Sequence, residues 1–136
     1  MLLKDKLKET KNKIDSLDAE IIFQEVLKID KAIIYSDIKK EINKTDLDSI
    51  DLMVEERLKG KPLAYLTGKK GFWKSDFIIS PDVLVPRPET ETLVEAVLNE
   101  NLQGKTLLEL GTGSGVISIS IAQESRDCII LSLIHI

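Results

Sequence analysis

Apolar residues recur every three or four positions through the first 60 residues, a spacing that predicts amphipathic helices. The clearest early stripe contains Leu17, Ile21, Ile22, Val26 and Ile29. A shorter candidate helix carries Ile33, Ile34, Ile38 and Ile42. Such stripes favour packing within a helical bundle, and a face that binds a partner is the alternative.

A third helix is predicted just before the first glycine of the chain. Thr45 and Asp48 resemble a capping box in which Asp replaces the usual Glu or Gln. Gly60 and Pro62 then supply stop signals for the helix. The apolar stripe between these signals consists of Leu47, Ile50, Val54 and Leu58.

From Pro62 onward the pattern predicts short strands and turns. Two strands, over residues 72–73 and 77–79, are expected to be joined around Lys74–Asp76. Pro88 is placed to begin a helix, and Glu89 and Glu91 suit the positive end of that helix. The helix should end before Gly104 and turn inward the side chains of Leu93, Val94, Val97 and Leu98.

The last third of the chain predicts a parallel βαβ unit. Thr106–Leu110 is expected to be a buried strand, Ser114–Glu124 a helix and Cys128–Ile130 the start of another strand. A strand, a glycine turn, a helix and a second strand make half of a doubly wound sheet. The chain should therefore combine a small helical bundle with an α/β domain.

The composition agrees with a division of the chain near residue 60. All seven glycines lie at Gly60 or later, whereas 27 of the 42 charged residues lie in residues 1–61. The net charge of −4 and the absence of a basic block argue against direct nucleic-acid binding. The alternating lysines of the amino-terminal segment are interpreted as a solvated helix face.

Several other function classes are disfavoured by the residue inventory. The one cysteine, Cys128, is expected to pack as a small core residue rather than act as a nucleophile. With one histidine in the chain, no metal site is expected. No apolar run reaches the roughly 18 residues of a membrane span. The first residues are too charged for a secretory signal, so a cytoplasmic location is expected.

The segment with chemical potential is the glycine turn after the strand 106–110. Glycines at alternate positions let the main chain turn sharply and approach a ligand closely. No lysine follows Gly115, so the turn is not a P-loop. The third glycine comes one residue too early for the dinucleotide fingerprint, and Ser114 lies between two glycines, unlike a nucleophile elbow.

The remaining pattern, acid-x-Gly-x-Gly-x-Gly, resembles motif I of the class I S-adenosylmethionine (SAM) methyltransferases. The resemblance implies a Rossmann-like, doubly wound sheet and a SAM cofactor. It also implies that Glu109 answers the positive charge of the ligand. The implied cofactor-binding residues are Glu109, Gly111, Thr112, Gly113, Ser114 and Gly115. A glycine-rich turn that only packs helix against strand is the alternative.

Further segments resemble the release-factor glutamine methyltransferases of the HemK type. Leu84–Glu91 matches the family's L-[IV]-P-R-P-[DE]-T-E signature, and Gly60–Gly68 with the following Phe72–Trp73 matches a second run. Leu17–Glu20 resembles an Asp-Ala-Glu motif of the family's helical domain. The resemblance implies a cofactor or substrate pocket that includes Phe77, Arg87, Pro88, Glu89 and Thr90. A rigid turn at Pro86–Pro88, and a purely structural ion pair of Arg87, remain alternatives.

The implied reaction transfers the SAM methyl group to the side-chain amide nitrogen of the glutamine in the Gly-Gly-Gln motif of class 1 peptide chain release factors. The implied protein is a cytoplasmic monomer without membrane or direct nucleic-acid contacts, and its helical domain helps dock the release factor. Methylation of a ribosomal-protein glutamine is one alternative. A non-catalytic interaction module built from the amino-terminal helices is another.

The chain departs from this family in its last part. It has no Asn-Pro-Pro-Tyr sequence, which in the family accepts the amide hydrogens, so no catalytic residue is assigned. We expect a helical docking domain at 1–66, a hairpin linker at 67–87 and a truncated SAM-binding domain at 88–136. Residues 131–136, LSLIHI, match the translation of an adapter used in preparing sequencing libraries, so they are expected to be a non-native tail in which His135 has no role. A natural apolar strand end is the alternative.

Overall fold

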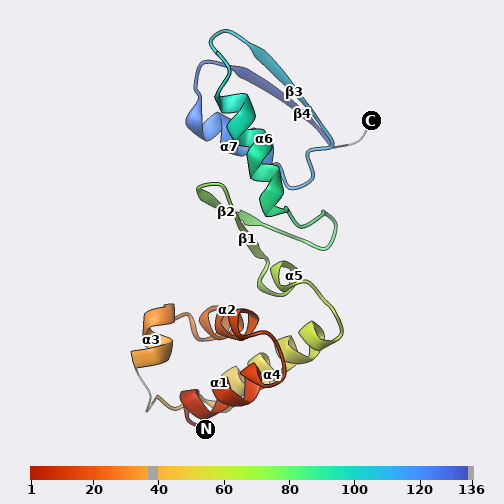
Figure 1. The fold of residues 1–136 in the computed structure, drawn as a ribbon. Coiled ribbons are helices and arrows are strands. Elements are labelled where there is room, and N and C mark those ends of the chain that lie inside the picture. Colours follow the sequence, from red (N-terminus) through yellow and green to blue (C-terminus); the bar gives the residue numbers. More distant parts are fainter. Residues whose placement is uncertain (37–39, 135–136) are drawn as a thin grey trace. The chain divides into compact units, whose positions relative to one another are not determined.

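The computed structural model describes residues 1–36 and 40–134, and the chain divides into two compact units, Met1–Thr67 and Gly68–Ile136 (Figure 1). The first unit is helical, and the second combines helices with two pairs of strands. The predicted α/β class with an amino-terminal helical bundle is therefore confirmed. The hairpin expected as a linker lies within the second unit, and the division at 66 and 87 stays a prediction. Within the described residues, no helix combines the length and apolarity needed to cross a membrane.

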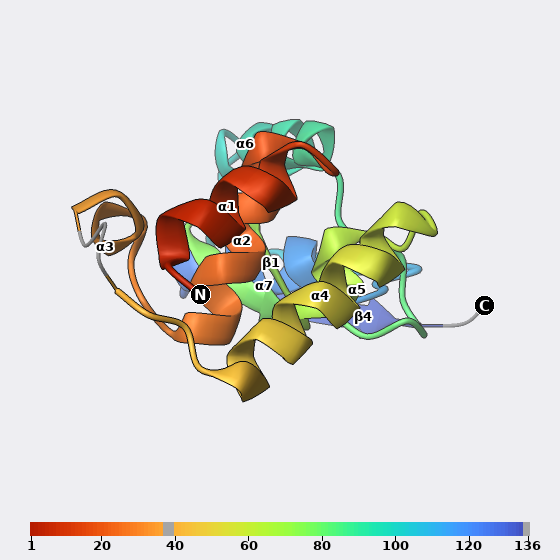
Figure 2. The ribbon, with the colours of Figure 1, turned by 90° about the horizontal axis from the view of Figure 1, so that it is seen from below.

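Five helices build the part of the first unit that the structure describes, and the second of them is central. Helix α2 packs against each of the other four. In Figure 2, α1 and α2 lie next to each other and α3 stands at the edge of the bundle. The helices are α1 (Leu3–Lys11), α2 (Ser16–Leu27), α3 (Lys31–Ser36), α4 (Lys44–Leu58) and α5 (Leu63–Thr67).

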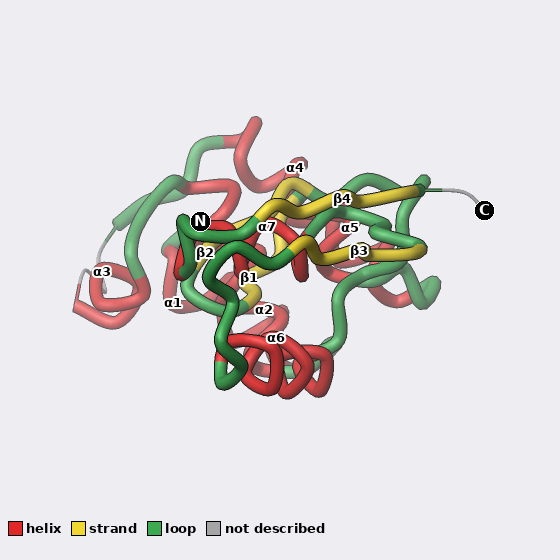
Figure 3. Tube along the Cα trace, turned by 90° about the horizontal axis from the view of Figure 1, so that it is seen from above, coloured by secondary structure: helices red, strands yellow, loops and turns green. Residues whose placement is uncertain are grey.

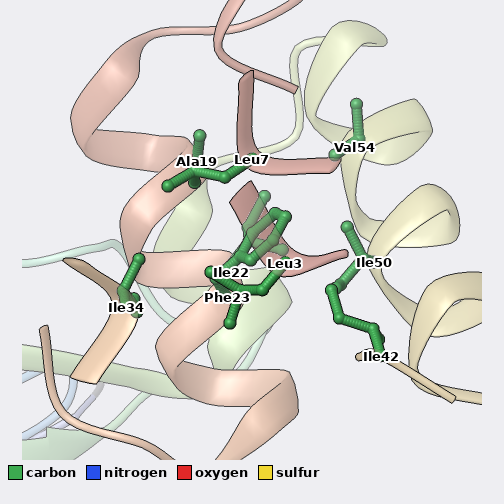
Figure 4. Packing of buried hydrophobic residues seen from close by; sticks show 9 residues of the cluster. All are labelled: Leu3, Leu7, Ala19, Ile22, Phe23, Ile34, Ile42, Ile50 and Val54. Carbon is green, nitrogen blue, oxygen red and sulfur yellow. The ribbon is translucent and has the colours of Figure 1, made fainter. Parts of the chain in front are cut away.

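The core of the bundle lies between α1, α2 and α4 (Figure 4). Its buried members are Leu3, Leu7, Ala19, Ile22, Phe23, Ile34, Ile42, Ile50 and Val54. The predicted α2 stripe is confirmed at Ile22, which is fully buried, and at Val26 and Ile29, which pack against the core. Leu17 is 58% exposed instead, and the fully buried Ala19 and Phe23 were not predicted. Phe23 and Ile22 lie side by side in the core, so the inward face of α2 is centred on them and Leu17 is left at the surface.

Two predicted helix boundaries were wrong. The side chain of Asn43, not that of Thr45, caps α4, and its Oδ1 accepts a hydrogen bond of 2.8 Å from the Asp46 N–H. Helix α3 ends at Ser36, so Ile42 reaches the core from non-helical chain rather than from the predicted helix. The Ile42 N–H donates to the Met1 carbonyl at 3.0 Å, which ties this segment to the start of the chain. Ile38 lies outside the described residues.

The second unit begins with an antiparallel hairpin of β1 (Lys69–Phe72) and β2 (Ser75–Ile78). The predicted strand at 72–73 was placed too late, because Trp73 occupies the turn with a φ of 55°. A 3-10 turn, η1 (Pro88–Thr90), leads into α6 (Glu91–Leu98) with Pro88 in the first turn, as predicted. Helix α6 buries Val94 completely but leaves Leu93 half exposed.

A parallel pair of strands completes the unit, as the sequence predicts. β3 (Thr106–Leu110) and β4 (Ile129–Leu133) run side by side (Figure 3), and α7 (Val116–Glu124) connects them. Helices α6 and α7 lie on one side of the pair in Figure 1, and the cavity between them is lined by Leu107 and Ile130 of the strands. The opposite face is exposed, so the prediction that residues 106–110 form a buried strand was wrong. Its side chains, 46–63% exposed, are Leu108, Leu110, Ile129, Leu131 and Leu133.

Candidate functional site

The glycine turn links β3 to α7 and holds three residues in the left-handed region. Gly111, Gly113 and Gly115 have φ values of 77°, 57° and 78°, and Gly115 is the N-cap of α7. Side chains are disfavoured at such angles, which explains the alternating glycines. A Cβ built on Gly111 or Gly113 meets nothing within 4 Å. The turn therefore leaves open space beside its main chain.

Backbone hydrogen bonds fix the shape of this turn. The N–H groups of Gly111 and Thr112 both donate to the carbonyl of Leu133, at 2.8 and 2.9 Å. The Gly115 N–H donates to the Thr112 carbonyl at 2.9 Å. All three N–H groups are thus bonded within the protein. The two that donate to Leu133 attach the turn to the end of β4. Residues 131–133, expected as part of a non-native tail, thus take part in β4 and hold the turn, whereas His135 lies outside the described residues.

Glu109 is the titratable group at the site, and it emerges near the end of β3. Its Oε2 accepts hydrogen bonds from Thr112 Oγ1 at 2.8 Å, from Ser132 Oγ at 2.7 Å and from Ser118 Oγ. Burial raises the pKa of Glu109, but the hydrogen bonds from Ser118, Ser132 and Thr112 outweigh it, so the pKa lies below its usual value. The carboxylate is therefore ionised at neutral pH.

The second carboxylate oxygen of Glu109, Oε1, distinguishes this side chain from an acid with a purely structural role. Glu109 Oε1 is buried and has no hydrogen-bond partner in the described part of the protein. A buried acceptor without a partner is costly, and such groups call for a ligand or a water. The side chain also lines a cavity of about 300 Å³ between β3, α6 and α7, whose other walls are mostly apolar. The site suits a ligand with an apolar body and a cationic or hydrogen-bond-donating group.

The second predicted group of site residues surrounds the start of α6. Phe77 is buried and its ring meets that of Phe72 edge to face, with centroids 6.2 Å apart. Arg87 and Glu89 are exposed, Pro88 opens η1, and Thr90 is half buried. No ion pair joins Arg87 to any residue that the structure describes. Within the described residues, no hydrogen bond connects the group around α6 with the glycine turn.

Two residues of the site were missed by the sequence reasoning. Ser118 and Ser132 both donate to Glu109, yet neither belongs to the glycine motif. Ser132 lies opposite Glu109 in the parallel register, a pairing that a prediction of strands with their register could have found. Ser118 faces the acid because it lies in the first turn of α7. Within residues 1–36 and 40–134, no cluster of His, Cys, Asp and Glu side chains could hold a metal ion.

The Asp-Ala-Glu motif of α2 proves to hold the bundle together. Asp18 pairs with Arg57 Nε of α4 at 2.6 Å, and Ala19 is fully buried. Glu20 is buried and accepts hydrogen bonds from Lys11 at 2.6 Å and from Tyr35, with Lys31 at 2.8 Å. These partners come from α1 and α3. The motif therefore fastens α2 to its neighbours.

Known proteins resemble the chain over both units. Residues 2–68 match the family model described as the PrmC N-terminal domain. A release factor glutamine methyltransferase of Coxiella burnetii is 40% identical over 117 residues, which are 85% of this chain and 42% of that protein. The release factor glutamine methyltransferase of Escherichia coli K12 is 35% identical over 117 residues, which are 85% of this chain and 42% of that protein.

The first unit matches the PrmC N-terminal domain, and the chain as a whole is similar to the release factor glutamine methyltransferases. A third relative of this name, from Leptospira interrogans, is 40% identical over 114 residues, or 82% of this chain. The chain spans about two fifths of the length of these curated relatives. The match to the PrmC N-terminal domain covers the helical bundle, and the wider similarity extends into the βαβ unit.

Proposed function

We propose that the chain is the donor-binding and substrate-docking part of a methyltransferase. This enzyme would transfer the methyl group of SAM to the amide nitrogen of the glutamine in the Gly-Gly-Gln motif of class 1 peptide chain release factors. The names of the relatives support the reaction. The observation that carries the proposal is the unpartnered, buried Oε1 of Glu109 beside an open glycine turn.

The residues of the turn fit SAM better than a nucleotide phosphate. SAM carries positive charge on its sulfonium and ammonium groups, and Glu109 is ionised. A phosphate would instead meet this negative charge. A phosphate cradle also needs free main-chain N–H groups, whereas those of Gly111, Thr112 and Gly115 are already bonded to carbonyls. The open space over Gly111 and Gly113 leaves room for the ligand.

Bound SAM supplies an electrophilic methyl group. Glu109 would hold the positive end of the donor, and the glycines would let the main chain lie close to it. The amide nitrogen of glutamine is a poor nucleophile, so the reaction depends on alignment with the methyl group rather than on a base. The alignment in this family is expected from an Asn-Pro-Pro-Tyr sequence, which this chain does not contain. We therefore expect the chain to bind the donor without transferring the methyl group.

We place the release factor on the helical bundle, in the cytoplasm, and expect the chain to act as a monomer without membrane or direct nucleic-acid contacts. The bundle is the part that matches the PrmC N-terminal domain. Its core is complete without the second unit, so it can present a fixed surface to a partner.

Calorimetric titration tests the donor site. We expect SAM to bind the chain and ATP not to bind. Gly113→Ala should weaken SAM binding by about tenfold or more, because the added methyl group enters the ligand space, a loss of about 1.4 kcal/mol. Gly104→Ala is the matched control, since Gly104 also has a positive φ, 67°, and open surroundings but lies outside the site. Binding of ATP in place of SAM would contradict the proposal.

Competition tests the substrate. The Escherichia coli relative is named for its action on release factors, so it can be assayed with labelled SAM at saturation. An excess of this chain should slow the labelling of a class 1 release factor, because the chain occupies the docking surface. A release factor with the Gln→Ala change should take up no label from the relative. If the chain slows the labelling of a ribosomal protein but not of the release factor, the ribosomal substrate is correct.

A further inference from the structure

The turn of the β1–β2 hairpin, residues 72–75, makes an unusual set of contacts with the two helices of its unit; we call it the Trp73 turn. Trp73 has a φ of 55°, which is uncommon for a bulky side chain and costs conformational energy. In this conformation the Trp73 N–H donates to Glu91 Oε1 at 2.8 Å. Glu91 is the first residue of α6. The strained turn is thus fastened to the amino end of α6.

The Trp73 turn also contacts the carboxyl end of α7. The indole Nε1–H of Trp73 donates to Glu124 Oε1 at 3.1 Å, and Lys74 Nζ lies 2.6 Å from the same oxygen. Lys74 Nζ also lies 5.9 Å from the centre of the Trp73 ring. Next to this group, the Ser75 hydroxyl donates to Gln123 Oε1 at 3.0 Å. The last two residues of α7 are therefore both held by the hairpin.

The negative charge of Glu124 is unfavourable at its position in α7. It is the last residue of α7, where the helix dipole presents its negative end and a carboxylate is disfavoured. Lys74 and the indole N–H of Trp73 compensate this charge, and together they lower the pKa of Glu124, Lys74 having the larger effect. An acid at this position is explained by its contacts with the hairpin rather than by the helix itself.

Both helices held by the Trp73 turn carry predicted site residues at their amino ends. The Arg87–Thr90 segment directly precedes Glu91. The glycine turn directly precedes α7, which has nine residues and so a length of about 13 Å at the usual helical rise. A short helix of this kind moves as a rigid rod, so a shift at Glu124 is transmitted to Gly115.

We propose that the Trp73 turn is a positioning clasp for the donor site. It fixes α6 and α7 relative to each other and so maintains the shape of the glycine turn. Trp73, Glu91 and Glu124 are positioning residues, since they act through the helices and touch no reactant. That the clasp serves SAM binding rests on the proposed function. Its effect on the glycine turn can be tested without any ligand.

Amide hydrogen exchange on the full chain tests this effect on the glycine turn. Exchange reports local opening residue by residue. In Glu124→Ala, the amides of Gly111, Thr112 and Gly115 should exchange about fivefold faster, the effect of losing one or two exposed hydrogen bonds. Glu124→Gln should retain most of the protection, because its amide oxygen still accepts the indole N–H. Glu95→Ala, which removes an exposed acid from α6, is the control and should leave these amides unchanged.

Two results would overturn the clasp. One is equal exchange of the glycine-turn amides in Glu124→Ala and Glu95→Ala. The other is a uniform rise in exchange over the whole second unit, β1 and β2 included, which would reveal a general structural role. Should Glu124→Ala fail to fold, Trp73→Phe removes the indole N–H while keeping a smaller aromatic ring, and it is expected to accelerate exchange of the same three amides.

Trp73 also reports on the link to the donor, because it is the only tryptophan in the chain. Coupling between two sites is reciprocal. SAM should therefore reduce the quenching of Trp73 fluorescence by acrylamide. Trp73→Phe should raise the Kd of SAM about threefold, which is somewhat less than the change in affinity that coupled sites usually show. If SAM fails to bind the unaltered chain, the proposed function is wrong, while the exchange experiment still decides the clasp. If SAM binds with the same Kd to Trp73→Phe, the clasp does not serve the donor site.

Discussion

Glu20 shows how a single buried charge can organise a small bundle. A carboxylate with 7% of its side chain exposed would be costly if it were unpaired. Hydrogen bonds from Lys11, Lys31 and Tyr35, in that order of importance, lower the pKa of Glu20 to about 2. Because these partners come from α1 and α3, the acid joins three helices at one point.

This arrangement predicts acid sensitivity of the helical unit. The folded pKa of about 2 lies below the ordinary value of 4.5, so the stabilisation is complete above about pH 4.5 and is lost as the pH falls toward 2. Glu20→Gln should destabilise the unit by about 1–3 kcal/mol at pH 7, because it leaves two lysines without their acid. Urea unfolding of both proteins at pH 7, 4 and 2.5 measures this. A difference between the two proteins that stays constant across the pH range would contradict the role of the charge.

The sequence predicted the acid of the proposed donor site but not its surroundings. Glu109 was predicted from the resemblance of the acid-x-Gly-x-Gly-x-Gly pattern to motif I of the class I SAM methyltransferases. Its hydrogen bonds to Ser118 and Ser132 depend on the start of α7 and on the register of β4, both of which are tertiary features. An isolated motif carries no information about residues that meet it from another strand.

At the scale of elements, glycines predicted the ends of elements more accurately than capping residues predicted their starts. The predicted bounds of β3 are those found, because apolar residues end directly at Gly111. The start of α4 was misplaced by two residues, although Asn43 and Thr45 are both good N-cap types. Tertiary contacts decide between them, since the bridge between Leu2 and Glu41 keeps the chain extended up to Ile42. Asn43 is then the first residue free to begin the helix.

The cap can be tested by a pair of substitutions. Asn43→Ala should destabilise the bundle by about 1 kcal/mol, because the Asp46 N–H loses its acceptor. Thr45→Ala should change the stability by less than about 0.5 kcal/mol, since Thr45 is exposed within the first turn. Thermal unfolding followed by circular dichroism compares the two variants. A larger loss for Thr45→Ala would show that the predicted capping box forms in solution.

At the scale of the whole molecule, the two units differ in how completely they bury their apolar surface. Among the residues that the structure describes, the bundle encloses nine core side chains. The β3–β4 pair is covered on one face and exposes five aliphatic side chains on the other. Parallel strands are stable when both faces are buried, and two strands alone make a marginal sheet.

This imbalance predicts separate unfolding of the units. A chain that ends at Lys70 keeps the whole bundle core, so it should melt cooperatively and at the temperature of the bundle in the full chain. The full chain should show an additional, broader transition at lower temperature, with light scattering that rises as the bare sheet face associates. Replacing Leu108 and Leu131 with Lys should reduce the scattering without shifting the transition of the bundle, because both side chains are more than half exposed. A single sharp transition of the full chain, with residues 104–130 protected by SAM, would instead show that the second unit is stable with one face uncovered.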